Sequence, residues 1–239
     1  MPGQSYRPNA FSDFPASHAE TATKFLTRVY LWMFAGLMAT TFVALAVAES
    51  ETLPRLIFEN RLAFWGLVVG ELGLVMFLSG AVNKLSPAAA AVLFILYSVL
   101  NGATVSAVLL VYTGESLIRA FLSATLLFAS MSAYGYVTRR DLASLGNLCL
   151  VGLFAVIASS ILNLFLGSSG LDYFTSIIGI LIFLGLTAYD TQKMLRIGDQ
   201  ATDGGEEALR KSAILGALAL YLDFINLFLF LLRVFGKRR

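Results

Sequence analysis

Residues 184–232 decide the fold, and they read LGLTAYDTQKMLRIGDQATDGGEEALRKSAILGALALYLDFINLFLFLL. Two apolar runs flank a polar connection, and each run carries one aspartate, Asp190 in TAYDTQKM and Asp223 in YLDFINLF. A carboxylate inside an apolar membrane span costs about 2.5–3.5 kcal/mol on insertion scales, and such residues usually have a functional role. The two acids are therefore the first candidates for a functional site.

The spacing of the two aspartates predicts that they face each other. We place the tip of the hairpin at Gly204-Gly205, so that Asp190 lies 14 residues before Gly204 and Asp223 lies 18 residues after Gly205. At about 1.5 Å per helical residue, their depths along two antiparallel helices differ by about 6 Å. Two carboxylates in one low-dielectric site do not both ionise easily, so one proton would be shared between them. The pair would also offer oxygen ligands to a metal ion such as Ca²⁺.

A purely structural role is the alternative for the same two acids. Asp190 ends its apolar run and could reach the membrane interface beside Lys193 or Arg196. Asp223 could form a hydrogen bond with Asn226, one helical turn later.

The composition predicts a protein that crosses the membrane several times. Of the 239 residues, 58% are hydrophobic and 13% are charged, and the mean hydropathy is +0.78. A soluble domain does not need so large an apolar fraction, whereas a multi-pass membrane protein does. The net charge of +2 indicates no nucleic-acid partner.

Apolar segments of about 20 residues, the length that crosses a bilayer as a helix, predict an all-α bundle of seven transmembrane helices. We expect a polar N-terminal tail at residues 1–27, helical from about Ser17, and a single transmembrane domain at residues 28–239. The polar stretch Thr191–Lys211 would connect the last two spans. The expected spans are about 29–48, 62–82, 88–112, 117–137, 145–166, a sixth from about 173, and 212–235.

Glu71 is a third acid within a span, near the middle of the second one. Small residues let neighbouring helices approach closely, so the glycines around it predict that Glu71 faces the bundle interior. It would then either lie on an ion path or form a hydrogen bond across helices. These glycines are Gly66, Gly70, Gly73 and Gly80.

This chain lacks residues that several classes of membrane protein require. His18, the one histidine, lies in the polar tail, which excludes histidine-based catalysis or zinc binding in the membrane. Cys149 is the one cysteine, so no disulfide forms within the chain. The last span has no lysine to hold retinal, and neither aspartate lies in the GxGD setting of an intramembrane aspartyl protease. We therefore expect no enzymatic activity and no cofactor.

Charge distribution predicts which way the chain crosses the membrane. Ten of the 17 lysines and arginines fall in the N-terminal tail or in the loops after spans two, four and six. Because cytoplasmic loops are enriched in these residues, we expect a cytoplasmic N-terminus. The basic C-terminus, GKRR at residues 236–239, argues the other way unless the seventh segment does not cross fully.

Four segments of the chain together resemble the bacterial branch of the Bax inhibitor family, the transmembrane BAX inhibitor motif proteins. They are FLTRVYLWMFAGL at 25–37, ELGLVMFLS at 71–79, AYDTQKM at 188–194 and LALYLDFINLFLFLLR at 218–233. The order and spacing fit from about Lys24 to Arg233, nearly the whole chain.

The resemblance implies a seven-helix bundle whose last helix is central and a pH-sensitive calcium leak in the bacterial inner membrane. It implies that Asp190 and Asp223 form the pH-sensing and gating pair. Relatives often carry an arginine soon after the ELGL motif as a partner for that pair, and this chain has Ser79-Gly80-Ala81-Val82 there. The candidates for a replacement base are Lys84, Arg139 and Arg140.

Two other functions remain as alternatives to a cation leak. One is a membrane regulator that transports nothing and binds a protease or a stress-response partner through the tail and residues 191–211. The other is a proton-coupled transporter of a small solute, which the absence of an internal repeat disfavours.

Overall fold

The computed structural model describes residues 16–81, 85–200 and 205–239, and in these ranges the chain is all-α, as the sequence predicts. The helices are α1 (Ala16–Glu49), η1 (Arg55–Glu59), α2 (Arg61–Ala81), α3 (Pro87–Val111), α4 (Gly114–Val137), α5 (Ala143–Leu166), α6 (Ser169–Gln200) and α7 (Gly205–Phe235).

Seven of these helices are long and apolar enough to cross a membrane, which confirms the predicted number of spans. The polar stretch Thr191–Lys211 is not a loop throughout, because α6 continues to Gln200 and α7 begins at Gly205. With 32 and 31 residues, these two helices are each about 47 Å long. They therefore exceed the apolar thickness of a bilayer, about 30 Å. The expected tip residue Gly204 lies outside the described residues.

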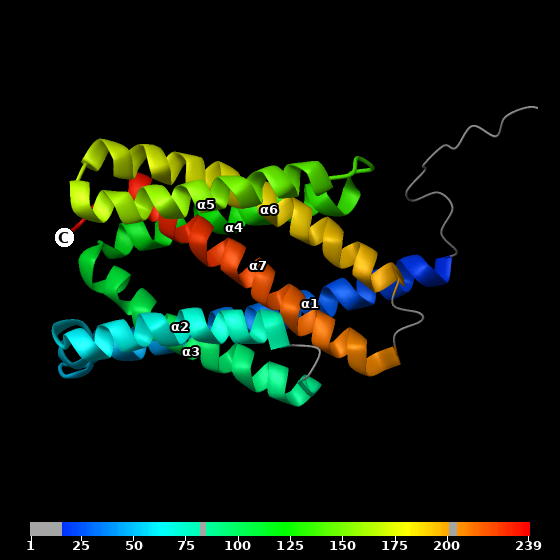
Figure 1. Ribbon diagram of the computed structural model, residues 1–239, viewed down its shortest axis with the longest axis horizontal. Helices are drawn as coiled ribbons and strands as arrows, with labels where there is room; N and C mark the ends of the chain where they lie inside the picture. The colour runs from blue at the N-terminus through cyan, green and yellow to red at the C-terminus, as the bar shows by residue number, and fades with distance from the viewer. Residues whose placement is uncertain (1–15, 82–84, 201–204) are drawn as a thin grey trace, which may run out of the picture.

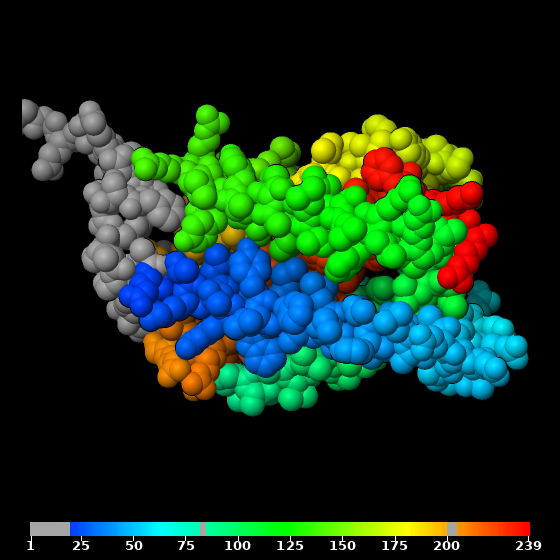
Figure 2. All heavy atoms as spheres, turned by 180° about the vertical axis from the view of Figure 1, so that it is seen from behind, coloured from blue at the N-terminus to red at the C-terminus, as the bar shows by residue number. Residues whose placement is uncertain are grey.

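Helix α7 occupies the centre of the bundle, as expected. It runs diagonally between the other helices (Figure 1) and packs against α6, α1, α4 and α3. Of its membrane-crossing window, 72% is buried, against 6% for α2. From the opposite side, α7 emerges mainly at its two ends, behind α1 and α4 (Figure 2).

Close helix contacts occur where glycines meet large side chains or backbone. Gly135 of α4 lies against the carbonyl group of Ala188 on α6, and Gly146 of α5 lies against the ring of Tyr189. A Cβ atom added at Gly198 of α6 would come within 2.9 Å of the Cα atom of Ala22 on α1. These contacts hold α6 between α1, α4 and α5.

The glycines of α2 do not serve as a packing face, which corrects the prediction from their spacing. A Cβ atom added at Gly66, Gly70, Gly73 or Gly80 would meet nothing within 4 Å. Helix α2 lies at the edge of the bundle (Figure 1), where it packs against α3 and η1. Among the described residues, no neighbouring helix therefore packs closely against these glycines.

The chain begins α1 and ends α7 at opposite ends of the bundle (Figure 1), so α7 runs from one end of the bundle to the other. Its C-terminal tail then pairs with the connection between α3 and α4. The Thr113 N–H donates to the Lys237 carbonyl at 3.1 Å, and the Arg239 N–H donates to the Val111 carbonyl at 2.9 Å. This pairing places the C-terminus beside the connection between α3 and α4.

We predict that Gly135→Ala destabilises the bundle, because the new methyl group would overlap the Ala188 carbonyl and push α4 away from α6. The expected loss is about 1–3 kcal/mol, measured as a lower melting temperature in detergent. Gly70→Ala is the matched control, since it adds the same methyl group in open space. Equal melting temperatures for the two variants would contradict the close packing of α4 against α6.

Candidate functional site

The structure brings Asp190 and Asp223 together. Asp190 lies on α6 and Asp223 on α7, two helices that pack along each other (Figure 1). Their carboxyl groups are close enough for the charge of Asp190 to repel that of Asp223. Asp223 is 4% exposed, and its Oδ2 atom has no hydrogen-bond partner in the described part of the chain. This atom is an exception, since buried polar groups are normally hydrogen-bonded.

One lysine lies near the pair. Lys193, three residues after Asp190 on α6, is close enough for its positive charge to attract that carboxylate. Its Nζ atom lies 5.9 Å from the centroid of the Tyr189 ring. Among the described residues, no positive charge acts in the same way on Asp223. Lys193, which the structural alternative placed beside Asp190, is thus the basic residue whose charge acts on the pair.

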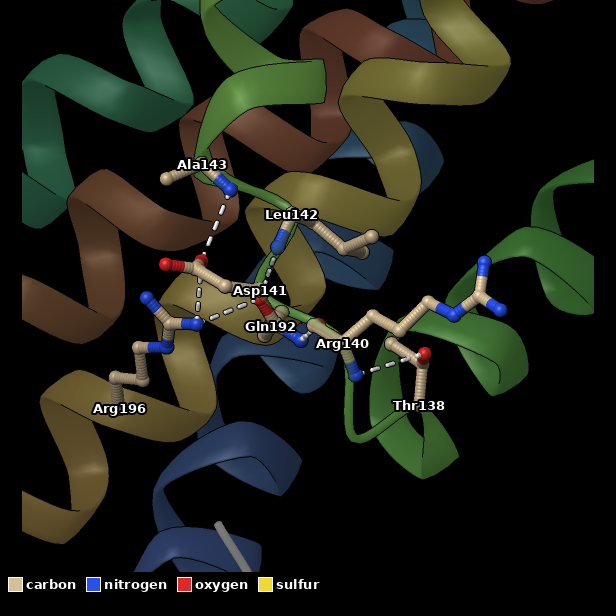
Figure 3. A network of polar contacts seen from close by, with 7 residues as sticks. All are labelled: Thr138, Arg140, Asp141, Leu142, Ala143, Gln192 and Arg196. Carbon is tan, nitrogen blue, oxygen red and sulfur yellow. Dashed lines mark hydrogen bonds and ion pairs between the residues drawn. The ribbon is translucent and has the colours of Figure 1, made fainter. Parts of the chain in front are cut away.

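The candidate bases from the sequence do not reach the pair. Arg139 and Arg140 are exposed in the connection between α4 and α5, and the Arg140 side chain points away from α6 (Figure 3). Lys84 lies outside the described residues. Arg196, considered as a partner of Asp190, instead forms an ion pair with Asp141 at 2.7 Å.

Asn226 supports its own helix. Its side-chain amide donates a hydrogen bond of 2.8 Å to the carbonyl of Leu222, one turn earlier on α7. It therefore leaves the buried Oδ2 atom of Asp223 without a donor, contrary to the structural alternative that paired Asp223 with Asn226.

Glu71 forms hydrogen bonds across helices, away from the aspartate pair. Its carboxylate accepts hydrogen bonds from the Thr104 hydroxyl and, at 3.4 Å, from the Asn101 side-chain amide, both on α3. Asn101 in turn accepts a hydrogen bond of 2.9 Å from the hydroxyl of Tyr221 on α7. The second use that the sequence suggested for Glu71, bonding between helices, is therefore present in the structure.

The network continues from Tyr221 to α1. The Tyr221 hydroxyl lies 2.6 Å from the Thr40 hydroxyl, whose oxygen lies 2.9 Å from the Ser98 carbonyl. Side chains of α2, α3, α7 and α1 are thereby joined inside the bundle. Tyr221 lies two residues before Asp223, about 200° around α7, so the network and the aspartate pair occupy different faces of the same helix.

Sequence reasoning missed Tyr221, although a signal was present. A tyrosine inside an apolar run that becomes buried needs a partner for its hydroxyl group. Asn101, a polar side chain in the middle of the third span, was an available partner.

Three further hydroxyl groups meet beside the pair. The Tyr30 hydroxyl of α1 lies 2.6 Å from that of Ser132 on α4, which lies 3.0 Å from that of Thr191 on α6. Thr191 follows Asp190 directly and is fully buried. These bonds fix the α6 segment that carries the first aspartate against two neighbouring helices.

A cluster of polar side chains holds the connection between α4 and α5 against α6 (Figure 3). The Gln192 side chain accepts a hydrogen bond of 2.9 Å from the Leu142 N–H and donates one of 2.8 Å to the Arg140 carbonyl. Arg196 donates to the same Gln192 oxygen at 2.9 Å and to Asp141 at 2.7 Å. Gln192 therefore supplies hydrogen-bond partners to two backbone groups of the connection, which lie outside any helix.

The described residues contain no group of three or more histidine, cysteine, aspartate or glutamate side chains placed to hold a metal ion. Two carboxylates alone supply fewer ligands than the roughly 6–8 oxygens that Ca²⁺ takes.

We predict that Tyr221→Phe destabilises the bundle without creating a cavity, because it leaves Asn101 Oδ1 without its donor. The expected loss is about 1–2 kcal/mol, read from the melting temperature in detergent. Tyr136→Phe, at an exposed position 43% accessible, is the control and should change nothing. Equal effects at the two positions would show that the buried network adds no stability.

We also predict that the contribution of Asp141 to stability does not vary with pH near neutrality. The hydrogen bond from the Ala143 N–H, the hydrogen bond from Arg196 and the positive charge of Arg196 lower the pKa of Asp141 below its ordinary 3.8. A lowered folded-state pKa stabilises the protein above the unfolded-state value and is lost only as pH falls through the folded-state value. Asp141→Asn should therefore lower the melting temperature equally from mildly acidic to mildly alkaline pH. An effect that titrates within that range would be inconsistent with this pKa.

Comparison with known proteins agrees with the fold. A family model described as "Inhibitor of apoptosis-promoting Bax1" matches residues 22–239. The chain is 45% identical to the inner membrane protein YbhL of Escherichia coli K12, covering 90% of this chain and 92% of that one. It is 42% identical to an uncharacterized protein of Borreliella burgdorferi, covering 90% and 93%. It is 38% identical to the uncharacterized membrane protein M6_Spy0327 of Streptococcus pyogenes, with the same coverage. With seven membrane-capable helices, the last of them largely buried, this chain belongs to the Bax inhibitor-1 family of membrane proteins.

Proposed function

We propose that this protein is a pH-regulated cation leak of the bacterial inner membrane, with Ca²⁺ as the permeant ion and the N-terminus in the cytoplasm. The observation that carries the proposal is the buried carboxyl group of Asp223, which lies close enough to Asp190 on the neighbouring helix for their charges to repel and has an oxygen without a donor. Stability alone does not favour such an arrangement, because an apolar side chain in the same place would cost nothing to desolvate.

The mechanism follows from the charge on the pair. With one shared proton the pair carries a single negative charge, and α6 and α7 pack together. Gain or loss of a proton changes the repulsion between the two carboxyl groups and hence the free energy of the α6–α7 contact. When both groups are ionised, a divalent cation between them offsets their repulsion, so the same pair both senses pH and attracts Ca²⁺.

The packed arrangement of α6 and α7 corresponds to a closed state in this proposal. Asp223 is 4% exposed, so water does not reach it freely, whereas Asp190 is partly exposed. Ion passage would require α7 to move relative to α6. Lys193 would bias this movement, since its charge attracts Asp190 in the closed arrangement.

We expect Ca²⁺ flux into proteoliposomes to change with pH for the wild-type chain, and to lose this pH dependence in Asp190→Asn and Asp223→Asn. Glu115→Gln is the control, because it neutralises an exposed carboxylate that is paired with Arg119 on α4. The flux of this variant should follow that of the wild type at each pH.

Two outcomes would count against the proposal. Flux that keeps its pH dependence in both aspartate variants would remove the pair as the sensor. Absence of flux above that of empty liposomes, with the protein shown to be folded by its melting transition, would favour a membrane regulator that binds a protein partner.

A further inference from the structure

The connection between α4 and α5 is held in one conformation by α6. Gln192 binds both the Arg140 carbonyl and the Leu142 N–H, and Asp141 forms an ion pair with Arg196 (Figure 3). The Asp141 carboxylate also accepts a hydrogen bond of 3.0 Å from the Ala143 N–H at the start of α5. Residues 138–142 therefore present their exposed side chains from a fixed backbone.

Two arginines of this connection have no anionic partner. Arg139 and Arg140 are exposed and form no ion pair with any residue that the structure describes. Other cations at the same end of the bundle are paired with nearby acids, Lys24 with Glu20 at 2.6 Å and Arg210 with Glu206 at 2.7 Å. The connection thus holds an uncompensated positive charge, unlike these paired positions.

The connection also lies where two helices leave the apolar layer. Val137, the last residue of α4, is 72% exposed, and Leu148 of α5 is 69% exposed, so both helices turn apolar side chains outward. Tyr134 and Tyr136 add exposed aromatic rings next to the connection, at 45% and 43%. Tyrosines of this kind lie at the level of lipid head groups. The two arginines are therefore placed at the membrane interface rather than in open water.

We propose that Arg139 and Arg140 bind the phosphate group of an anionic phospholipid. Guanidinium groups match phosphate oxygens in charge and geometry, and basic sites at the ends of transmembrane helices bind acidic head groups. The site does not depend on ion conduction, so it goes beyond the proposed function.

The test uses the full chain in a neutral detergent and follows the melting temperature while phosphatidylglycerol is titrated into the micelles. The wild type should be stabilised by phosphatidylglycerol and much less by phosphatidylcholine. The double variant Arg139→Gln with Arg140→Gln should need about tenfold more phosphatidylglycerol, or more, for the same shift. Arg119→Gln, at the opposite end of α4 and paired with Glu115, is the matched control and should respond as the wild type does.

A second variant and a second anion distinguish lipid binding from misfolding and from binding of a free anion. The double variant Arg139→Lys with Arg140→Lys keeps both charges and should recover part of the response, which would not happen if the glutamine variant had merely lost its fold. An unchanged phosphatidylglycerol response in the glutamine variant would overturn the proposal. A shift of the same size with inorganic phosphate would also overturn it, because the site would then bind a free anion rather than a lipid.

Discussion

The arrangement of this bundle depends on the burial of one long helix, α7, which packs against α1, α3, α4 and α6. Most of its membrane-crossing window is inside the protein, whereas α2 keeps almost all of its own outside. A helix enclosed in this way must either be apolar all round or have a partner for each polar group. Helix α7 is largely apolar. Two of its polar side chains, Tyr221 and Asp223, differ in whether their polar atoms have hydrogen-bond partners. The first is hydrogen-bonded to two neighbouring helices, whereas the second keeps an oxygen without a donor.

Tyr221 and Asp223 act on the position of α7 in different ways. Tyr221 fixes one face to α3 and α1 through hydrogen bonds. Asp223 faces α6 across a repulsive contact with Asp190, which weakens as soon as one of the two carboxyl groups is protonated. In the proposed function, a helix fixed on one face and subject to a proton-dependent repulsion on the other would have two arrangements of similar free energy, as a gated element requires. The hydroxyl group of Thr191 and the Gln192 contacts keep the α6 side of this contact rigid.

The periodicity and length of the apolar segments were enough to predict seven helices and the α6–α7 hairpin, because a bilayer fixes the length of a crossing helix. The approach of Asp190 and Asp223 followed from counting residues from the turn. The sequence named both Lys193 and Arg196 as possible neighbours of Asp190, but it could not show that Gln192 and Asp141 engage Arg196 and leave Lys193 as the base that acts on Asp190. The glycines of α2 were wrongly predicted to form a packing face, because small residues permit close packing without requiring it. Tyr221 was missed because its partners come from α3 and α1, far away in the chain.

A double-mutant cycle on the pair tests the central claim most directly. The free energies of unfolding of the wild type, Asp190→Asn, Asp223→Asn and the double variant are compared in detergent at mildly alkaline pH, where repulsion between the two carboxylates is largest. If the carboxyl groups interact, either single substitution relieves the repulsion and the second adds little. The effects would then depart from additivity by more than about 0.5 kcal/mol. Additive effects would show that the two aspartates act separately, and a proton-sharing pair at the α6–α7 contact would be ruled out.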